Sequence, residues 1–193
     1  SIDNLNWILA CIEKQKIFFT GTAAKEGTVN VSPKGTDSLR VLNNRQIAWL
    51  NLTGSGNETA AHLREINRIS LMFCAFAGDP LILRIYGQAK TIHRQDADWA
   101  DLYPLFPPNN GARNIFIVAI DRVQTSCGFA VPLMDYQKDR TILTDWSAKK
   151  TDEQMTSYWK EKNLTSIDGF PTGLLDWSPF KLNSCSGGNR VFE

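Results

Sequence analysis

Residues 49–73 constrain the fold of this chain most, because two strand-like runs flank a polar turn and a short helix. The first apolar run spans Gln46–Leu52, and the second spans residues 68–76. The intervening turn contains two glycines, which accept positive φ and let backbone approach a ligand. A helix is expected over residues 58–66. Its free N–H groups and positive dipole end would face the turn.

The turn allows two interpretations. Thr53, Ser55, Asn57 and Thr59 offer hydroxyls and an amide at a helix N-terminus, which is a site suited to a phosphate ester. The alternative needs no ligand, because Ser55 and Glu58 fit the capping-box pattern and Asn57 could itself cap the helix. Glu58 would also repel a phosphate. No Lys-Ser/Thr pair follows the second glycine, so the turn is not a Walker A loop.

Length and composition indicate one globular domain over residues 1–193, with a helical and loop extension from about residue 124. The net charge of +1 and the lack of a basic run argue against nucleic acid or a membrane surface as a partner. The four cysteines are scattered, which favours buried free thiols over disulfides, and no metal site is expected from two histidines. Without a spanning or signal-like segment, the expected location is cytoplasmic.

Strand-like runs with short connections predict a mainly β (α+β) fold, a six-stranded antiparallel split β-barrel with flanking helices. Helices are expected over residues 3–14, 95–103 and 149–163, and turns over 168–171 and 186–189. Gly87 is expected at a bulge or a barrel bend in the fifth strand. The six expected strands span residues 16–23, 28–31, 46–52, 68–76, 81–92 and 113–123.

Two cations interrupt the strand pattern. Lys34 follows Pro33, which cannot donate to a sheet ladder, so residues 32–35 must leave the sheet or lie at its edge. Lys34 is then either a solvated loop lysine or a cation beside a phosphate or an electron-rich ring. Arg84 breaks an apolar run, so it faces solvent at a sheet edge or points at a ligand or a partner subunit.

Three segments together, VNVSPKG at 29–35, WLNLTGSGNETAAHLRE at 49–65 and NRISLMF at 67–73, resemble the pyridoxamine 5'-phosphate oxidase-like, FMN-binding split-barrel family. The resemblance is strongest over about residues 16–93. It implies a homodimer with FMN at the subunit interface and the FMN phosphate at the turn and helix start after the third strand.

The resemblance also implies site residues. Val31, Ser32, Pro33, Lys34 and Gly35 match the strand end beside the flavin ring and ribityl chain, and Asn51, Leu52 and Thr53 match the next strand end. Ser55, Asn57 and Thr59 fall at the phosphate contacts. The best-known members carry Arg-Lys in this turn, whereas this chain has Gly56-Asn57-Glu58. Neutralisation would then come from Lys34, Arg64 or Arg84, or from helix N–H groups.

The function implied is an FMN-dependent oxidoreductase that passes hydride or electrons from a reductant such as NAD(P)H to an unknown small-molecule acceptor. Lys34 is expected to act electrostatically near the flavin ring. The true oxidases end in an Arg- and His-bearing segment, and this sequence has no histidine after His93, which argues against pyridoxamine phosphate as substrate. The alternative is a non-catalytic split-barrel module that binds flavin or haem for storage or sensing.

Overall fold

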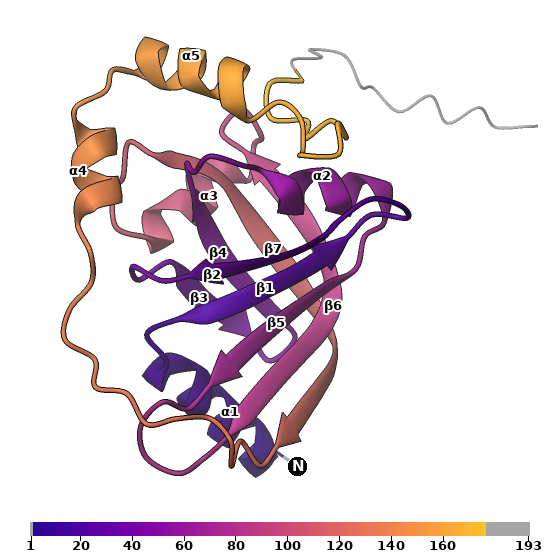
Figure 1. Ribbon diagram of the computed structural model, residues 1–193, viewed down its shortest axis with the longest axis vertical. Helices are drawn as coiled ribbons and strands as arrows, with labels where there is room; N and C mark the ends of the chain where they lie inside the picture. The colour runs from indigo at the N-terminus through magenta and orange to yellow at the C-terminus, as the bar shows by residue number, and fades with distance from the viewer. Residues whose placement is uncertain (1, 177–193) are drawn as a thin grey trace, which may run out of the picture.

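A curved, open antiparallel sheet forms the body of the molecule (Figure 1). The computed structural model describes residues 2–176, with side chains from residue 7 onward, so the turn expected at residues 186–189 and the fourth cysteine lie outside the described residues. The strands follow the order β2-β1-β5-β6-β7-β4-β3, and no ladder joins β2 to β3. The predicted split, mainly antiparallel α+β fold is confirmed. The strands are β1 (Phe18–Ala23), β2 (Val29–Lys34), β3 (Leu39–Asn43), β4 (Gln46–Leu52), β5 (Ile69–Cys74), β6 (Ile82–His93) and β7 (Ala112–Ser126).

Seven strands replace the six that were expected, because β3 was missed. This strand has five residues, and four of them are half-buried in succession, so it shows none of the alternation that identifies a strand. It pairs with β4 at the edge of the sheet. β2 also runs further than expected, to Lys34, because Pro33 lies on an edge strand, where its missing N–H costs no ladder bond.

Helices cover both ends of the sheet (Figure 1). α1 (Ile2–Lys14) lies at one end, while α2 (Glu58–Glu65) and α5 (Asp152–Lys162) lie at the other. An extended segment after β7 runs along the side of the molecule to α4 (Ile142–Ala148), a helix that the sequence pattern did not predict. α3 (Trp99–Leu102) and the 3-10 turn η1 (Tyr103–Leu105) occupy the region expected as one helix. No described helix is both long and apolar enough to cross a membrane.

The core explains why residues 49–73 position the rest of the chain. Trp49 on β4 is fully buried and stacks on Phe116 of β7 with ring centroids 4.5 Å apart. Phe18 of β1 packs edge-on against Trp49 and stacks with Phe73 of β5. Aromatic pairs of this kind add about 0.5–1.5 kcal/mol each beyond the area they bury. They tie β4 and β5, the strands that flank the turn and α2, to β7 and β1.

The cysteines agree with their expected state in part. Cys11, Cys74 and Cys127 are free thiols, as expected, but of these three only Cys74 is buried, whereas Cys11 is half-buried and Cys127 is exposed. The register between β6 and β7 shifts at Tyr86 and Gly87, which confirms the bulge. A Cβ at Gly87 would collide with the backbone oxygen of Ala119, so the close approach of the two strands requires glycine.

Candidate functional site

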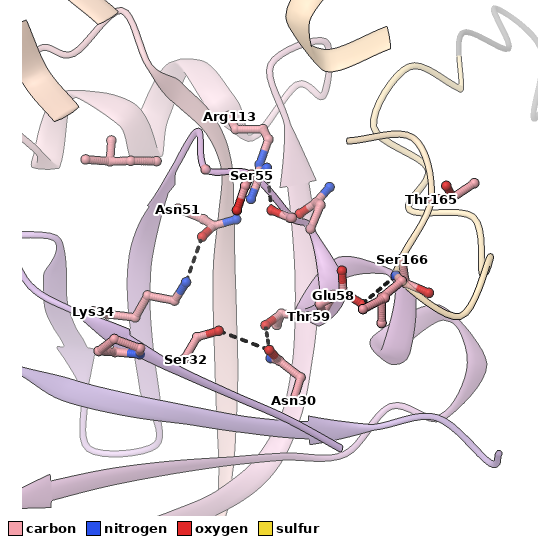
Figure 2. A pocket seen from close by; sticks show the side chains of 16 residues that line it. Asn30, Ser32, Lys34, Asn51, Ser55, Glu58, Thr59, Arg113, Thr165 and Ser166 are labelled. Carbon is pink, nitrogen blue, oxygen red and sulfur yellow. Dashed lines mark hydrogen bonds between the residues drawn. The ribbon is translucent and has the colours of Figure 1, made fainter. Parts of the chain in front are cut away.

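A pocket of about 630 Å³ opens beside the turn between β4 and α2 (Figure 2). Four separate segments form its walls: β2, the end of β4 with the following turn, the start of β7, and a turn after α5. The predicted strand–turn–helix–strand unit therefore does border a cavity. The lining residues are Asn30, Ser32, Pro33, Lys34, Asn51, Leu52, Gly54, Ser55, Gly56, Asn57, Glu58, Thr59, Arg113, Thr165, Ser166 and Ile167.

The turn is held from behind by the rest of the chain. The Thr53 N–H and hydroxyl both donate to the Gly111 carbonyl, at 2.7 and 2.8 Å. The Trp159 indole N–H of α5 donates to the Thr53 hydroxyl at 2.8 Å, and the Asn163 amide donates to the Gly54 carbonyl. Thr53 is therefore buried behind the turn rather than lining the pocket, and it fixes the turn in place.

Neither form of helix capping that the sequence allowed is present. Asn57 occupies the N-cap position of α2, but its side chain makes no capping hydrogen bond. The capping box fails because the Glu58 carboxylate accepts the backbone N–H of Ile167 at 3.0 Å instead of returning to Ser55. The first N–H groups of α2 thus have no side-chain partner, and the Glu58 carboxylate, which lines the pocket, is bonded to the turn after α5 (Figure 2).

Arg113 is the cation that sequence reasoning missed. The side chain is almost fully buried, and its Nη1 donates to the Gly56 carbonyl at 2.9 Å and to Asn163 Oδ1 at 2.8 Å. Its Nε has no partner among the described residues. Burial lowers the pKa of the guanidinium to about 10, against smaller opposing effects of Tyr158 and Glu58. A buried positive charge therefore lies directly beside the glycine turn.

A β-bulge aims this arginine into the pocket. Asn51 of β4 pairs with Asn114, but the next residue, Leu52, pairs with Ala112, so Arg113 is an extra residue on β7. Bulges bend a strand and redirect a side chain, often next to functional sites. Strict alternation along β7 could not predict this direction. The available signal was a charged residue at the start of an apolar strand, which differs from the signal at Arg84, a charge inside an apolar run.

Lys34 enters the pocket from β2 (Figure 2). Its ammonium donates to Asn51 Oδ1 at 3.4 Å, and the Asn51 amide donates to Asn114 Oδ1 at 3.1 Å. Burial, and then the charge of Arg113, lower the pKa of Lys34 to about 8. None of the ion pairs in the described part of the chain includes Lys34 or Arg113. The pocket therefore holds two cations without a carboxylate partner, which favours an anionic ligand.

Some predicted site residues lie elsewhere. Val31 projects from the other face of β2 and is 65% exposed. Gly35 lines a second cavity of about 480 Å³ beside α1. Arg84 bonds the Ser126 hydroxyl at 2.8 Å, and Arg64 forms an ion pair with Asp176, so neither lines the pocket within this chain. Ser32, Pro33, Lys34, Asn51, Leu52, Ser55, Asn57 and Thr59 do line it.

Fold and site together define a small α+β protein with a cationic pocket at a helix N-terminus. The family model described as pyridoxamine 5'-phosphate oxidase matches residues 7–127. A curated pyridoxamine 5'-phosphate oxidase family protein of Aspergillus flavus, ustO, is 40% identical over 188 residues, covering 88% of this chain and 74% of the relative. The chain belongs to the pyridoxamine 5'-phosphate oxidase family.

The solved structure of HupZ shares the fold of this chain. HupZ of Group A Streptococcus matches with a TM-score of 0.50 and 16% identity, over 63% of this chain and 93% of the other. A pyridoxamine 5'-phosphate oxidase-related, FMN binding protein of Nostoc punctiforme matches with a TM-score of 0.45 and 12% identity, over 62% of this chain and 81% of the other.

Proposed function

We propose that this protein is an FMN-dependent oxidoreductase that passes hydride or electrons from a reductant such as NAD(P)H to a small-molecule acceptor. The observation that carries the proposal is the pair of unneutralised cations, Lys34 and Arg113, beside an uncapped helix N-terminus. Among the anionic ligands that would fit such a pocket, family membership supports a flavin phosphate.

The residues present fit FMN. The cavity volume of about 630 Å³ falls within the usual range of small-molecule sites, roughly 300–1,000 Å³. Gly54 leaves open space where a side chain would stand, since a Cβ there would meet no atom within 4 Å. Buried Asn57 Oδ1 and Arg113 Nε lack partners among the described residues, which is typical of polar atoms that complete their bonding with a ligand.

The binding roles follow from where each residue lies. Arg113, Ser55, Thr59 and the first N–H groups of α2 would hold the phosphate. Ser32, Lys34 and Asn51 would lie along the ribityl chain and ring. FMN, when bound, supplies the hydride-accepting ring. Lys34, oriented by Asn51, places a positive charge where reduction of the ring adds negative charge, which raises the reduction potential.

A homodimer with the cofactor between subunits is part of this proposal. The outer edge of the sheet supports it, because Val29 and Val31 on edge strand β2 are 73% and 65% exposed. Arg84 lies on β6 opposite Met72, outside the pocket of its own chain, and could reach a site completed by a second copy. Light scattering should report twice the mass of the chain at micromolar concentration. A monomer that retains flavin would contradict this arrangement.

The test is direct. The purified protein should show flavin absorbance bands, bind FMN more tightly than FAD, and lose those bands on anaerobic addition of NADH or NADPH. Bound flavin that is reduced neither by NADH or NADPH nor by any reductant other than dithionite would favour the non-catalytic binding module instead. A haem Soret band without flavin bands would contradict the proposal, as would the absence of any flavin binding.

A further inference from the structure

A chain of buried and half-buried polar side chains leads from the pocket wall to His62, which is fully buried on α2. His62 Nδ1 lies 3.2 Å from the Thr22 hydroxyl of β1. The Asn30 amide donates to Thr22 Oγ1 at 3.4 Å and to Thr59 Oγ1 at 3.3 Å. The Ser32 hydroxyl donates to Asn30 Oδ1 at 3.0 Å (Figure 2). Asn30 therefore joins two pocket-lining hydroxyls to a histidine that has no contact with the pocket.

This arrangement fixes which hydroxyl can donate to a ligand. Thr22 and Thr59 both accept from the Asn30 amide, so the Thr22 hydrogen is left for His62 Nδ1 and the Thr59 hydrogen is left for the pocket. The Ser32 hydrogen is already used on Asn30, so Ser32 offers only lone pairs to a ligand. In this state, Thr59 acts as a donor and Ser32 acts as an acceptor.

The same heavy atoms support the reverse state. If His62 carries its proton on Nδ1, that N–H donates to Thr22. Asn30 is the other side chain that bonds the Thr22 hydroxyl among the described residues, so the Thr22 hydrogen finds an acceptor only when it points at Asn30. Asn30 would turn its carbonyl oxygen toward Thr22 and Thr59 and its amide toward Ser32, so Thr59 would lose its free hydrogen. His62 Nε2 has no partner among the described residues, so this atom favours neither tautomer. Binding of a ligand can therefore select one of the two hydrogen-bond states.

We propose that His62 and Thr22 are positioning residues that set the donor and acceptor polarity of the anion subsite through Asn30. The inference rests on the proposed function, because it takes a phosphate to be held at the N-terminus of α2. A phosphate needs donors, so it selects the state in which Thr59 donates and His62 Nδ1 accepts. Phosphate binding and the Nε2–H tautomer of His62 are then linked, and each must favour the other.

Nitrogen NMR of the imidazole rings tests the linkage. The sequence has only two histidines, so a His93→Gln variant assigns the His62 signals. Saturation with FMN should give the tautomer with the proton on Nε2, whereas riboflavin, which lacks the phosphate, should not shift the equilibrium. A His62 ring that keeps its proton on Nδ1 in the FMN complex would overturn the inference.

Thr22→Val supplies a second test, with Thr22→Ser as the matched control. Valine keeps the shape of the threonine side chain but removes the hydroxyl that joins Asn30 to His62. One amide hydrogen of Asn30 is then unpaired, which favours the reverse state, in which the Asn30 carbonyl oxygen faces Thr59. FMN affinity should fall on the order of tenfold, the loss expected for one hydrogen bond to a charged group, while riboflavin affinity stays constant. Serine should retain wild-type affinity for both. Equal losses for FMN and riboflavin in the valine variant would show a purely structural role for Thr22 and contradict the proposal.

Inorganic phosphate, titrated in the same NMR experiment, separates this inference from the proposed function. A tautomer change with phosphate in a protein that binds no flavin would refute the oxidoreductase proposal alone. FMN binding without a tautomer change would refute the relay alone. No response to either probe would overturn both.

Discussion

Arg113→Met should separate ligand binding from folding at the pocket. Methionine keeps much of the length and apolar bulk of arginine but removes the charge beside the glycine turn. A hydrogen bond to a charged group contributes roughly 1.5–3 kcal/mol, so we expect FMN affinity to fall on the order of 10- to 100-fold. Riboflavin affinity should hardly change, because the lost interaction is with the phosphate.

The stability of the ligand-free protein should respond differently. Burial lowers the pKa of Arg113 to about 10, and at about 1.4 kcal/mol per pKa unit the folded state holds this charge at a cost of about 3 kcal/mol. Removing it relieves that cost but leaves the Gly56 carbonyl and Asn163 Oδ1 without a donor, at roughly 1–3 kcal/mol each. These effects oppose each other, so the unfolding free energy of the apo variant should lie within about 3 kcal/mol of that of wild type.

Isothermal titration with FMN and riboflavin, together with denaturant unfolding of the apo protein, measures both quantities. Arg113→Lys is the matched control, since it keeps the charge but loses the fork geometry that bonds two acceptors at once. Its FMN affinity should fall between wild type and Arg113→Met. The reasoning fails if Arg113→Met binds FMN as tightly as wild type, or if it loses FMN and riboflavin affinity equally.

Further predictions concern Lys34, Ser55 and Gly87. The pKa of Lys34 is lowered to about 8, so the unfolded chain binds more protons than the folded chain between about pH 8 and 10.5. The unfolding free energy of the apo protein should therefore rise with pH over that interval in wild type. It should not do so in Lys34→Met. FMN binding at pH 8.5 should also take up protons, seen as a buffer-dependent titration enthalpy. Ser55→Ala should weaken FMN binding on the order of tenfold. Its apo stability should stay within about 0.5 kcal/mol of wild type, because Ser55 is exposed and does not cap α2. A loss of stability that matches the loss of affinity would instead indicate that Ser55 caps the helix. Gly87→Ala should lower the unfolding free energy by at least about 1–3 kcal/mol. Gly54→Ala is the control and should not lower it, because a Cβ at Gly54 meets open space. Equal melting curves for the two variants would contradict the close packing at the bulge.

Local patterns predicted the elements whose signals lie within a few residues. The apolar runs around Trp49 and Phe73 and the glycine turn between them gave β4, α2 and β5 in the right order. Pro33 was correctly restricted to an edge or an exit, but the pattern could not decide that β2 continues through it. β3 gave no signal, because its side chains are half-buried on both faces.

The pocket was predictable only where its walls are contiguous in sequence. Ser32 and Lys34 lie at the end of one strand, and Ser55 and Thr59 follow another, so the order of motifs in the sequence predicted both walls. Arg113 reaches the pocket through the pairing of β4 with β7 and a bulge, neither of which periodicity encodes. Ile167 lines the pocket because its backbone N–H, in the turn after α5, donates to Glu58, which lies more than one hundred residues away in sequence.

Under the proposed function, the cation that holds the phosphate lies on β7 rather than in the turn, which changes when the cost of ordering its side chain is incurred. A lysine or arginine in an exposed turn loses side-chain freedom as the ligand binds, which weakens affinity. Arg113 loses that freedom on folding, because the Gly56 carbonyl and Asn163 already orient it. The ligand-free protein instead carries two close cations, whose mutual repulsion contributes to the lowered pKa of Lys34. Phosphate binding should relieve this repulsion, so the site is preorganised for an anion at the expense of apo stability.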